Sequence, residues 1–128
     1  MPKLFFDTRF FAEYFYSNDK ESHASAKNFV SENKERYVSA VTIHEMYLMT
    51  LAKEGREVAR LRLQTVEDLF RVIEVNSKIA VEAAELKHKS RIPMADGLIA
   101  ASCKFIEGRC VTDDPHLTSL RDIRTVWP

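Results

Sequence analysis

Four acidic side chains lie where the chain is expected to leave a strand or enter a helix: Asp7, Glu45, Asp96 and Asp114. In an open α/β sheet, functional groups gather beyond the carboxyl ends of the strands, so these four are expected to converge. Carboxylates held close together repel one another, and some of them must then take up protons or bind a cation. The set therefore predicts a divalent-metal site and metal-dependent chemistry on phosphate.

Each acid also has a local structural explanation. Asp7 can cap the helix that follows it, where its oxygen would accept a free backbone N–H. Glu45 completes a T-x-x-E capping box that opens at Thr42. Asp96 suits the positive end of a helix dipole, and Asp114 stands before a proline at a helix start. Taken singly, none of the four requires a metal.

The residues around the four acids favour the interpretation that the acids bind a metal ion together. Asp7 follows the hydrophobic run Leu4-Phe5-Phe6, and Asp96 begins the most apolar helix expected in the chain. Helical spacing gives Glu45 apolar neighbours and partial exposure to water. Acids at the edge of a core are costly unless something compensates them, and one cation would serve all four.

The elements that must position these acids alternate between strands and helices. Apolar runs predict strands at residues 3–6, 37–41, 71–75, 109–112 and 123–127. Helical periodicity predicts helices at residues 8–16, 22–33, 42–53, 57–70, 77–90, 93–107 and 114–120. This alternation predicts an α/β fold, a three-layer α/β/α arrangement with a five-stranded parallel sheet, in a single domain over residues 1–128.

Composition is that of a soluble globular domain, with 45% hydrophobic and 30% charged residues. The 19 basic and 19 acidic residues balance, which neither requires nor excludes a nucleic-acid partner. The apolar runs are shorter than the roughly 18 residues of a membrane helix, so we expect a cytoplasmic protein with no membrane partner. Cys103 and Cys110 match no metal or redox spacing, and we expect both to be buried.

Four short motifs occur in a fixed order along the whole chain. They are Asp7-Thr8, S-x-x-x-x-x-E from Ser39 to Glu45, A-D-x-x-I-A at residues 95–100, and T-x-D-x-x-L at residues 112–117. None of them is specific alone, but together they resemble the PIN domain. A chain made only of this domain is similar to a VapC-type toxin of a prokaryotic toxin–antitoxin pair.

The resemblance implies a magnesium- or manganese-dependent ribonuclease (Mg2+ or Mn2+) with an RNA substrate. It implies an acidic site of Asp7, Glu45, Asp96 and Asp114, which would be both catalytic and metal-binding, with Thr112 as a supporting hydroxyl. We expect Asp7 and Asp96 to bind the metal most directly. A toxin of this kind would also have a small DNA-binding antitoxin as its partner.

The chain departs from the family pattern beside two of the motifs. Arg9 follows Thr8 where serine is common, and it can contact a substrate phosphate or pair with a site carboxylate. Asp113 stands beside the motif acid and either substitutes for it or points to solvent. His116 is additional, and we interpret it as a histidine on a surface turn.

The segment FFDTRFFAEYFY at residues 5–16 is richer in aromatic residues than one strand and one helix need for a core. If Tyr16 and Phe11 are left outside, they form an apolar patch of the kind that marks interaction sites. We therefore expect a homodimer interface, an antitoxin-binding groove, or both. The alternative is that all of these rings are core residues.

Other functions remain open or are excluded by the motifs. A PIN fold without activity would lack one of the acids, and a PIN nuclease of RNA processing or decay would often carry further RNA-binding modules. Aspartyl phosphatases require D-x-D, which Asp7-Thr8-Arg9 does not provide. The three glycines cannot build a dinucleotide-binding or P-loop motif.

Overall fold

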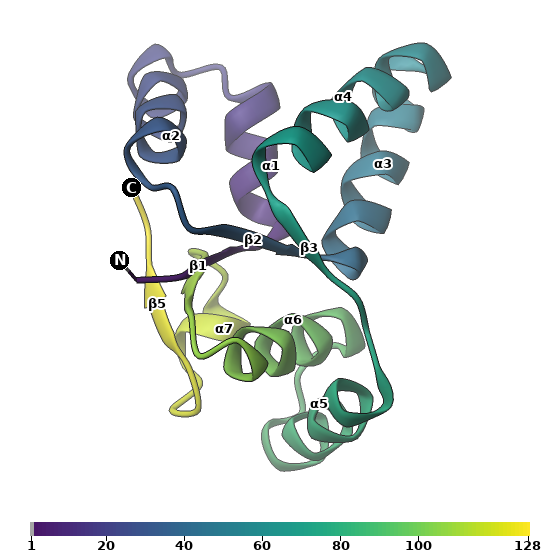
Figure 1. Ribbon diagram of the computed structural model, residues 1–128, viewed down its shortest axis with the longest axis vertical. Coiled ribbons are helices and arrows are strands. Elements are labelled where there is room, and N and C mark those ends of the chain that lie inside the picture. The colour runs from purple at the N-terminus through teal and green to yellow at the C-terminus, as the bar shows by residue number, and fades with distance from the viewer. Residues whose placement is uncertain (1) are drawn as a thin grey trace.

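The computed structural model describes residues 2–128, which form a parallel sheet with helices on both faces (Figure 1). The strands are β1 (Leu4–Phe6), β2 (Arg36–Ser39), β3 (Arg71–Ile73), β4 (Arg109–Val111) and β5 (Arg124–Val126). The helices are α1 (Thr8–Tyr16), α2 (Lys20–Glu32), α3 (Ala40–Glu54), α4 (Arg56–Leu69), α5 (Ser77–Ser90), α6 (Met94–Phe105) and α7 (Pro115–Thr118). In Figure 1, α1 to α4 lie above the sheet and α5 to α7 below it, so the predicted α/β/α fold is confirmed.

The sheet reverses its strand order beside its central strand. The order is β3-β2-β1-β4-β5, and every neighbouring pair is parallel. The chain therefore builds outward from β1 through β2 and β3, then returns to the other side of β1 with β4 and β5. Crevices at such a switch point, beyond the carboxyl ends of the strands, are where open α/β sheets bind ligands. Asp7 follows β1 and Thr112 follows β4, so both lie at this crevice.

Burial on both faces explains why β1 is a continuous hydrophobic run. Leu4 and Phe6 pack into the core on the side of α1 to α4, whereas Phe5 packs into the core beside α5 and α6. The Phe6 ring meets the rings of Phe10 and Phe70 edge-on, with centroids 4.7 and 5.0 Å apart. These contacts hold the end of β1 and the start of α1 in a fixed position on either side of Asp7.

The boundary between β2 and α3 differs from the prediction. The strand ends at Ser39 rather than residue 41, and α3 begins at Ala40 because the Ser39 side chain accepts a hydrogen bond from the Val41 N–H at 3.0 Å. The capping box proposed for Thr42 and Glu45 is therefore wrong. Glu45 lies in the second turn of α3, where its carboxylate is not used as a cap.

The aromatic residues of α1 are mostly core residues. Phe11 is fully buried and the centroid of its ring lies 5.1 Å from that of Phe70, so for this residue the core alternative is confirmed. Tyr16 is partly buried and donates a hydrogen bond to Glu54 at 2.6 Å. These two residues therefore do not form the apolar patch expected at the start of the chain.

Two expectations from composition can be compared with the structure. Cys103 and Cys110 are both buried free thiols, as predicted. Within residues 2–128, every helix is too short or too polar to cross a membrane.

Candidate metal centre

Asp7 and Thr112 join the ends of β1 and β4. The Asp7 side chain caps α1, with Oδ1 accepting from the Phe10 N–H at 3.2 Å, and Oδ2 accepts from the Thr112 hydroxyl at 2.5 Å. The same hydroxyl oxygen accepts the Asp114 N–H at 3.0 Å. Thr112 therefore connects a carboxylate that is only 3% exposed to the loop that carries Asp114.

The environment of Asp7 disfavours its ionised form. Its pKa is raised from 3.8 to about 6, mainly by burial and to a smaller extent by the nearby charges of Asp114 and Asp113. The hydrogen bonds from Thr112 and the Phe10 N–H act in the opposite direction but are outweighed. An ionised Asp7 would be stabilised by a cation in the crevice.

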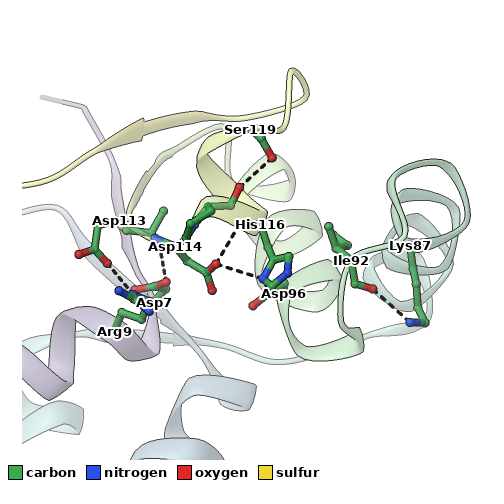
Figure 2. Close-up of polar contacts among 11 residues, drawn as sticks. Asp7, Arg9, Lys87, Ile92, Asp96, Asp113, Asp114, His116 and Ser119 are labelled. Carbon is green, nitrogen blue, oxygen red and sulfur yellow. Dashed lines mark hydrogen bonds and ion pairs between the residues drawn. The ribbon is translucent and has the colours of Figure 1, made fainter.

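Asp96 and Asp114 approach each other from different elements. Asp96 lies in the first turn of α6, and Asp114 is the N-cap of α7, where it accepts the His116 N–H at 2.9 Å. The His116 Nδ1 atom lies 3.3 Å from Asp96 Oδ2 and 3.2 Å from Asp114 Oδ1 (Figure 2). One ligand atom from each of the three residues lies within 4.8 Å of the others. The two carboxylate side chains are 15% and 17% exposed, so solvent reaches the cluster.

Close packing of α6 against α5 fixes the position of Asp96. A Cβ atom at the neighbouring Gly97 would lie 3.1 Å from the Ala83 carbonyl oxygen, so glycine permits this approach. Burial raises the pKa of Asp96, and the charges of Asp114 and Glu45 raise it further, while His116 and Arg9 lower it. Two of the other predicted site acids, Asp114 and Glu45, therefore disfavour ionisation of Asp96.

Glu45 faces the site from the opposite layer. It is half-buried in α3, and its Oε1 accepts a hydrogen bond from the Thr8 hydroxyl at 2.5 Å. Thr8 is the first residue of α1, directly after Asp7. The two threonines, Thr8 and Thr112, thus each hold one predicted site acid in place.

Arg9 does not pair with any of the four motif acids. Its Nε donates to Asp113 Oδ1 at 2.6 Å, and the two side chains are exposed at 54% and 43% (Figure 2). This hydrogen bond is the main reason that the pKa of Arg9 is raised. Asp113 therefore forms an ion pair beside the motif acid, while a phosphate contact by Arg9 stays a prediction.

The donor set fits a hard divalent cation. Carboxylate oxygens from Asp96 and Asp114 are open to solvent, and both Asp7 and Asp96 are less readily ionised than isolated carboxylic acids. Magnesium and manganese prefer such oxygen ligands and keep several waters. Sequence reasoning did not include His116 in this cluster. Its only local signal is the D-P-H order, because an N-cap aspartate brings the residue two positions later beside its carboxylate.

Solved structures of toxin–antitoxin proteins share this fold. VapBC2 from Rickettsia felis, bound to a DNA fragment from its promoter, is 13% identical with a TM-score of 0.79, covering 98% of each chain. FitAcB from Neisseria gonorrhoeae is 21% identical with a TM-score of 0.76, covering 95% of each chain. VapC20 from Mycobacterium tuberculosis, a sarcin-ricin loop cleaving toxin, is 18% identical with a TM-score of 0.74, covering 95% of this chain and 99% of that one.

Sequence comparisons identify the family. Comparison with curated proteins gives no match. A comparison with protein families matches the PIN domain over residues 4–123. This match includes all four motif acids and nearly the whole chain, and the chain therefore belongs to the PIN domain family.

Proposed function

We propose that this chain is a divalent-metal-dependent ribonuclease. The observation that carries the proposal is the convergence of Asp7, Asp96 and Asp114 at the switch point between β1 and β4 in a PIN fold. Glu45 contributes to the raised pKa of Asp96 and accepts a hydrogen bond from Thr8 beside Asp7, which supports assigning all four acids to one site. A set of carboxylates this close together is suited to binding a cation beside a phosphodiester.

The four acids divide into two pairs by position, since the cluster of close ligand atoms includes Asp96 and Asp114 but not Asp7 or Glu45. Asp96 and Asp114 would hold magnesium or manganese directly, because their oxygens lie close together and are partly open to solvent, so Asp114 would take the place that we expected Asp7 to have. Asp7 is buried and both of its oxygens already accept hydrogen bonds, so Asp7 and Glu45 would orient water or complete the shell. When bound, the ion would lower the pKa of an attacking water and neutralise charge that develops on the phosphoryl oxygens.

Single-stranded or looped RNA is the substrate class that suits this site. Asp96 and Asp114 are partly open to solvent, and a bent backbone with unstacked bases would reach such a site more readily than a duplex. One structural neighbour, from M. tuberculosis, is a toxin that cleaves the sarcin-ricin loop, which supports the same class of substrate. Arg9 is exposed beside the site and would contact a substrate phosphate once its bond to Asp113 opens.

We infer that the nuclease is the toxin of a type II toxin–antitoxin pair, with a small DNA-binding antitoxin as its partner. One neighbour is a toxin–antitoxin complex from Klebsiella pneumoniae, and three others are VapBC or FitAB proteins bound to DNA. One apolar surface that would suit a partner lies between α3 and α4, where a cavity of about 340 Å³ is lined by Ile43, His44, Tyr47, Leu48, Leu51 and Leu63. Leu48 is 57% exposed, and an apolar groove of this kind suits the apolar face of an antitoxin helix. The expected homodimer stays a prediction, which sedimentation equilibrium would measure.

Cleavage of a mixed pool of short structured RNAs tests the nuclease proposal. We expect cutting with manganese or magnesium, none with EDTA, and at least about a hundredfold loss in Asp96→Asn, because that change removes a charged metal ligand. Asp68→Asn is the matched control, since Asp68 is exposed on α4 and bonded to Gln64, away from the crevice. Cutting that survives both EDTA and Asp96→Asn would show that the acidic cluster is not the active site.

A metal titration by calorimetry separates the two remaining outcomes if no RNA is cut. Binding of manganese that is lost in Asp96→Asn would support a nuclease with a narrow substrate range. A folded protein that binds no divalent ion would instead be a PIN-fold binding module, and the catalytic proposal would be wrong.

A further inference from the structure

His116 lies between two acids of the proposed site. Its backbone N–H is bonded to Asp114 Oδ1, which fixes the residue in the only turn of α7. Its ring then places Nδ1 at nearly equal distances, 3.2 and 3.3 Å, from one oxygen of Asp114 and one of Asp96. Figure 2 shows the imidazole beside Asp96, with a dashed line that joins it to Asp114. The ring therefore lies in contact distance of both carboxylates.

These separations match the geometry of ligands around one ion. In an octahedral site with metal–ligand distances of about 2.1 Å, adjacent ligand atoms lie about 3.0 Å apart. The two His116 contacts exceed that value by only a few tenths of an ångström. A cation could thus contact Nδ1 and both carboxylate oxygens with small side-chain movements, and more than half of the His116 side chain is exposed and free to adjust.

We propose that His116 Nδ1 is a third protein ligand of the metal, beside Asp96 and Asp114, and that it biases the site toward manganese over magnesium. This inference rests on the proposed function, since it concerns the same site. Magnesium and manganese both bind carboxylate oxygens, but manganese is a transition metal that also accepts imidazole nitrogen, whereas magnesium strongly prefers oxygen. A site with two carboxylates and one imidazole would therefore bind manganese more tightly than a site of carboxylates alone.

The competing explanation gives the opposite result. A protonated His116 would carry a positive charge between the two carboxylates and take the place of the cation. Removing the ring would then free the site and tighten metal binding. The sign of the change in affinity on removal of the imidazole separates a ligand from a competitor.

Calorimetric titration of manganese and magnesium at fixed pH measures that sign. We expect His116→Ala to weaken manganese binding at least about tenfold and magnesium binding much less. His116→Gln, which offers an oxygen, should bind magnesium like the wild type while losing the preference for manganese. His88→Ala is the matched control, because His88 is an exposed histidine on α5, and it should change neither affinity.

Pulsed electron paramagnetic resonance of bound manganese gives a readout that is independent of affinity and activity. Protein labelled with ¹⁵N-histidine should show nitrogen coupling to the metal in the wild type and in His88→Ala, and none in His116→Ala. Unchanged or tighter manganese binding in His116→Ala, or absence of coupling in the wild type, would overturn the inference. If the wild type cleaves RNA and binds manganese without coupling, only the role of His116 fails. If it binds no divalent ion at all, the proposed function fails with it.

Discussion

Replacing Asp7 with asparagine should stabilise the metal-free protein at neutral pH, although the change removes a predicted site residue. Asp7 is 3% exposed, and its pKa is raised from 3.8 to about 6, mainly by burial. That difference corresponds to about 3 kcal/mol of destabilisation once the group is ionised in both states. Asparagine can still accept the Phe10 N–H, so the helix cap is kept.

The difference in stability between Asp7→Asn and the wild type should depend on pH. Because the folded pKa lies above the unfolded one, the folded state binds more protons between about pH 4 and pH 6, and stability falls as pH rises through that window. Asparagine lacks this dependence. Loss of the hydrogen bond from Thr112 in Asp7→Asn costs about 1 kcal/mol at any pH. The free energy of unfolding of the variant should therefore exceed that of the wild type by about 2 kcal/mol at pH 7.5, and this advantage should disappear near pH 4.

Urea denaturation in EDTA, followed by circular dichroism at about pH 4 and pH 7.5, measures the two free energies of unfolding. The difference between Asp7→Asn and the wild type should change by about 2–3 kcal/mol between these pH values. Asp113→Asn is the matched control: its carboxylate is exposed and paired with Arg9, so its effect should stay below about 1 kcal/mol. Equal destabilisation by Asp7→Asn at both pH values would refute the reasoning, because it would show that the charge of Asp7 is favourable and its role is structural.

Three further outcomes follow from the same geometry. Thr112→Val should cost about 1–3 kcal/mol and weaken manganese binding in a calorimetric titration, since it leaves Asp7 and the Asp114 N–H without a partner, whereas Thr112→Ser should restore both. Gly97→Ala should lower the free energy of unfolding in urea by about 1–3 kcal/mol and reduce metal affinity, because the added Cβ presses on the Ala83 carbonyl and shifts Asp96. Manganese at about 100 times its Kd should add about 2.7 kcal/mol to wild-type stability, measured as a rise in Tm that Asp96→Asn lacks.

The order and type of the elements could be predicted because each depends on local patterns. The boundary at Ser39 could not, since Ala40 and Val41 continue an apolar run that is equally consistent with a strand. Only the hydrogen bond from the Val41 N–H to the Ser39 side chain shows that the helix has already begun. The consequence extends to the site, because the earlier start places Glu45 in the second turn, facing Thr8.

The site itself was only partly accessible from sequence. Asp7 and Asp114 could be selected because they follow strands, and strand ends meet at one edge of a parallel sheet. The contact of His116 with Asp96 depends on how closely α6 approaches α7, and no local pattern encodes that distance. The burial of Phe11 likewise depends on Phe70, which is 59 positions further along the chain (70 − 11 = 59).

The aromatic core beside the site explains how the protein tolerates a carboxylate as unfavourable as Asp7. Phe6 precedes Asp7 and Phe10 donates its N–H to it, and both rings are fully buried against each other. Each such ring stabilises the fold by roughly 1.5–3 kcal/mol, which is comparable to the cost of the buried charge. A less rigid core would let water reach Asp7 and lower its pKa. Water would then solvate the ionised carboxylate, so a bound cation would stabilise it less. Phe10→Leu should therefore bring the pKa of Asp7 closer to 3.8 and weaken metal binding, even though the leucine touches no ligand. The tight packing that excludes water from the end of β1 would thus contribute to the proposed metal site.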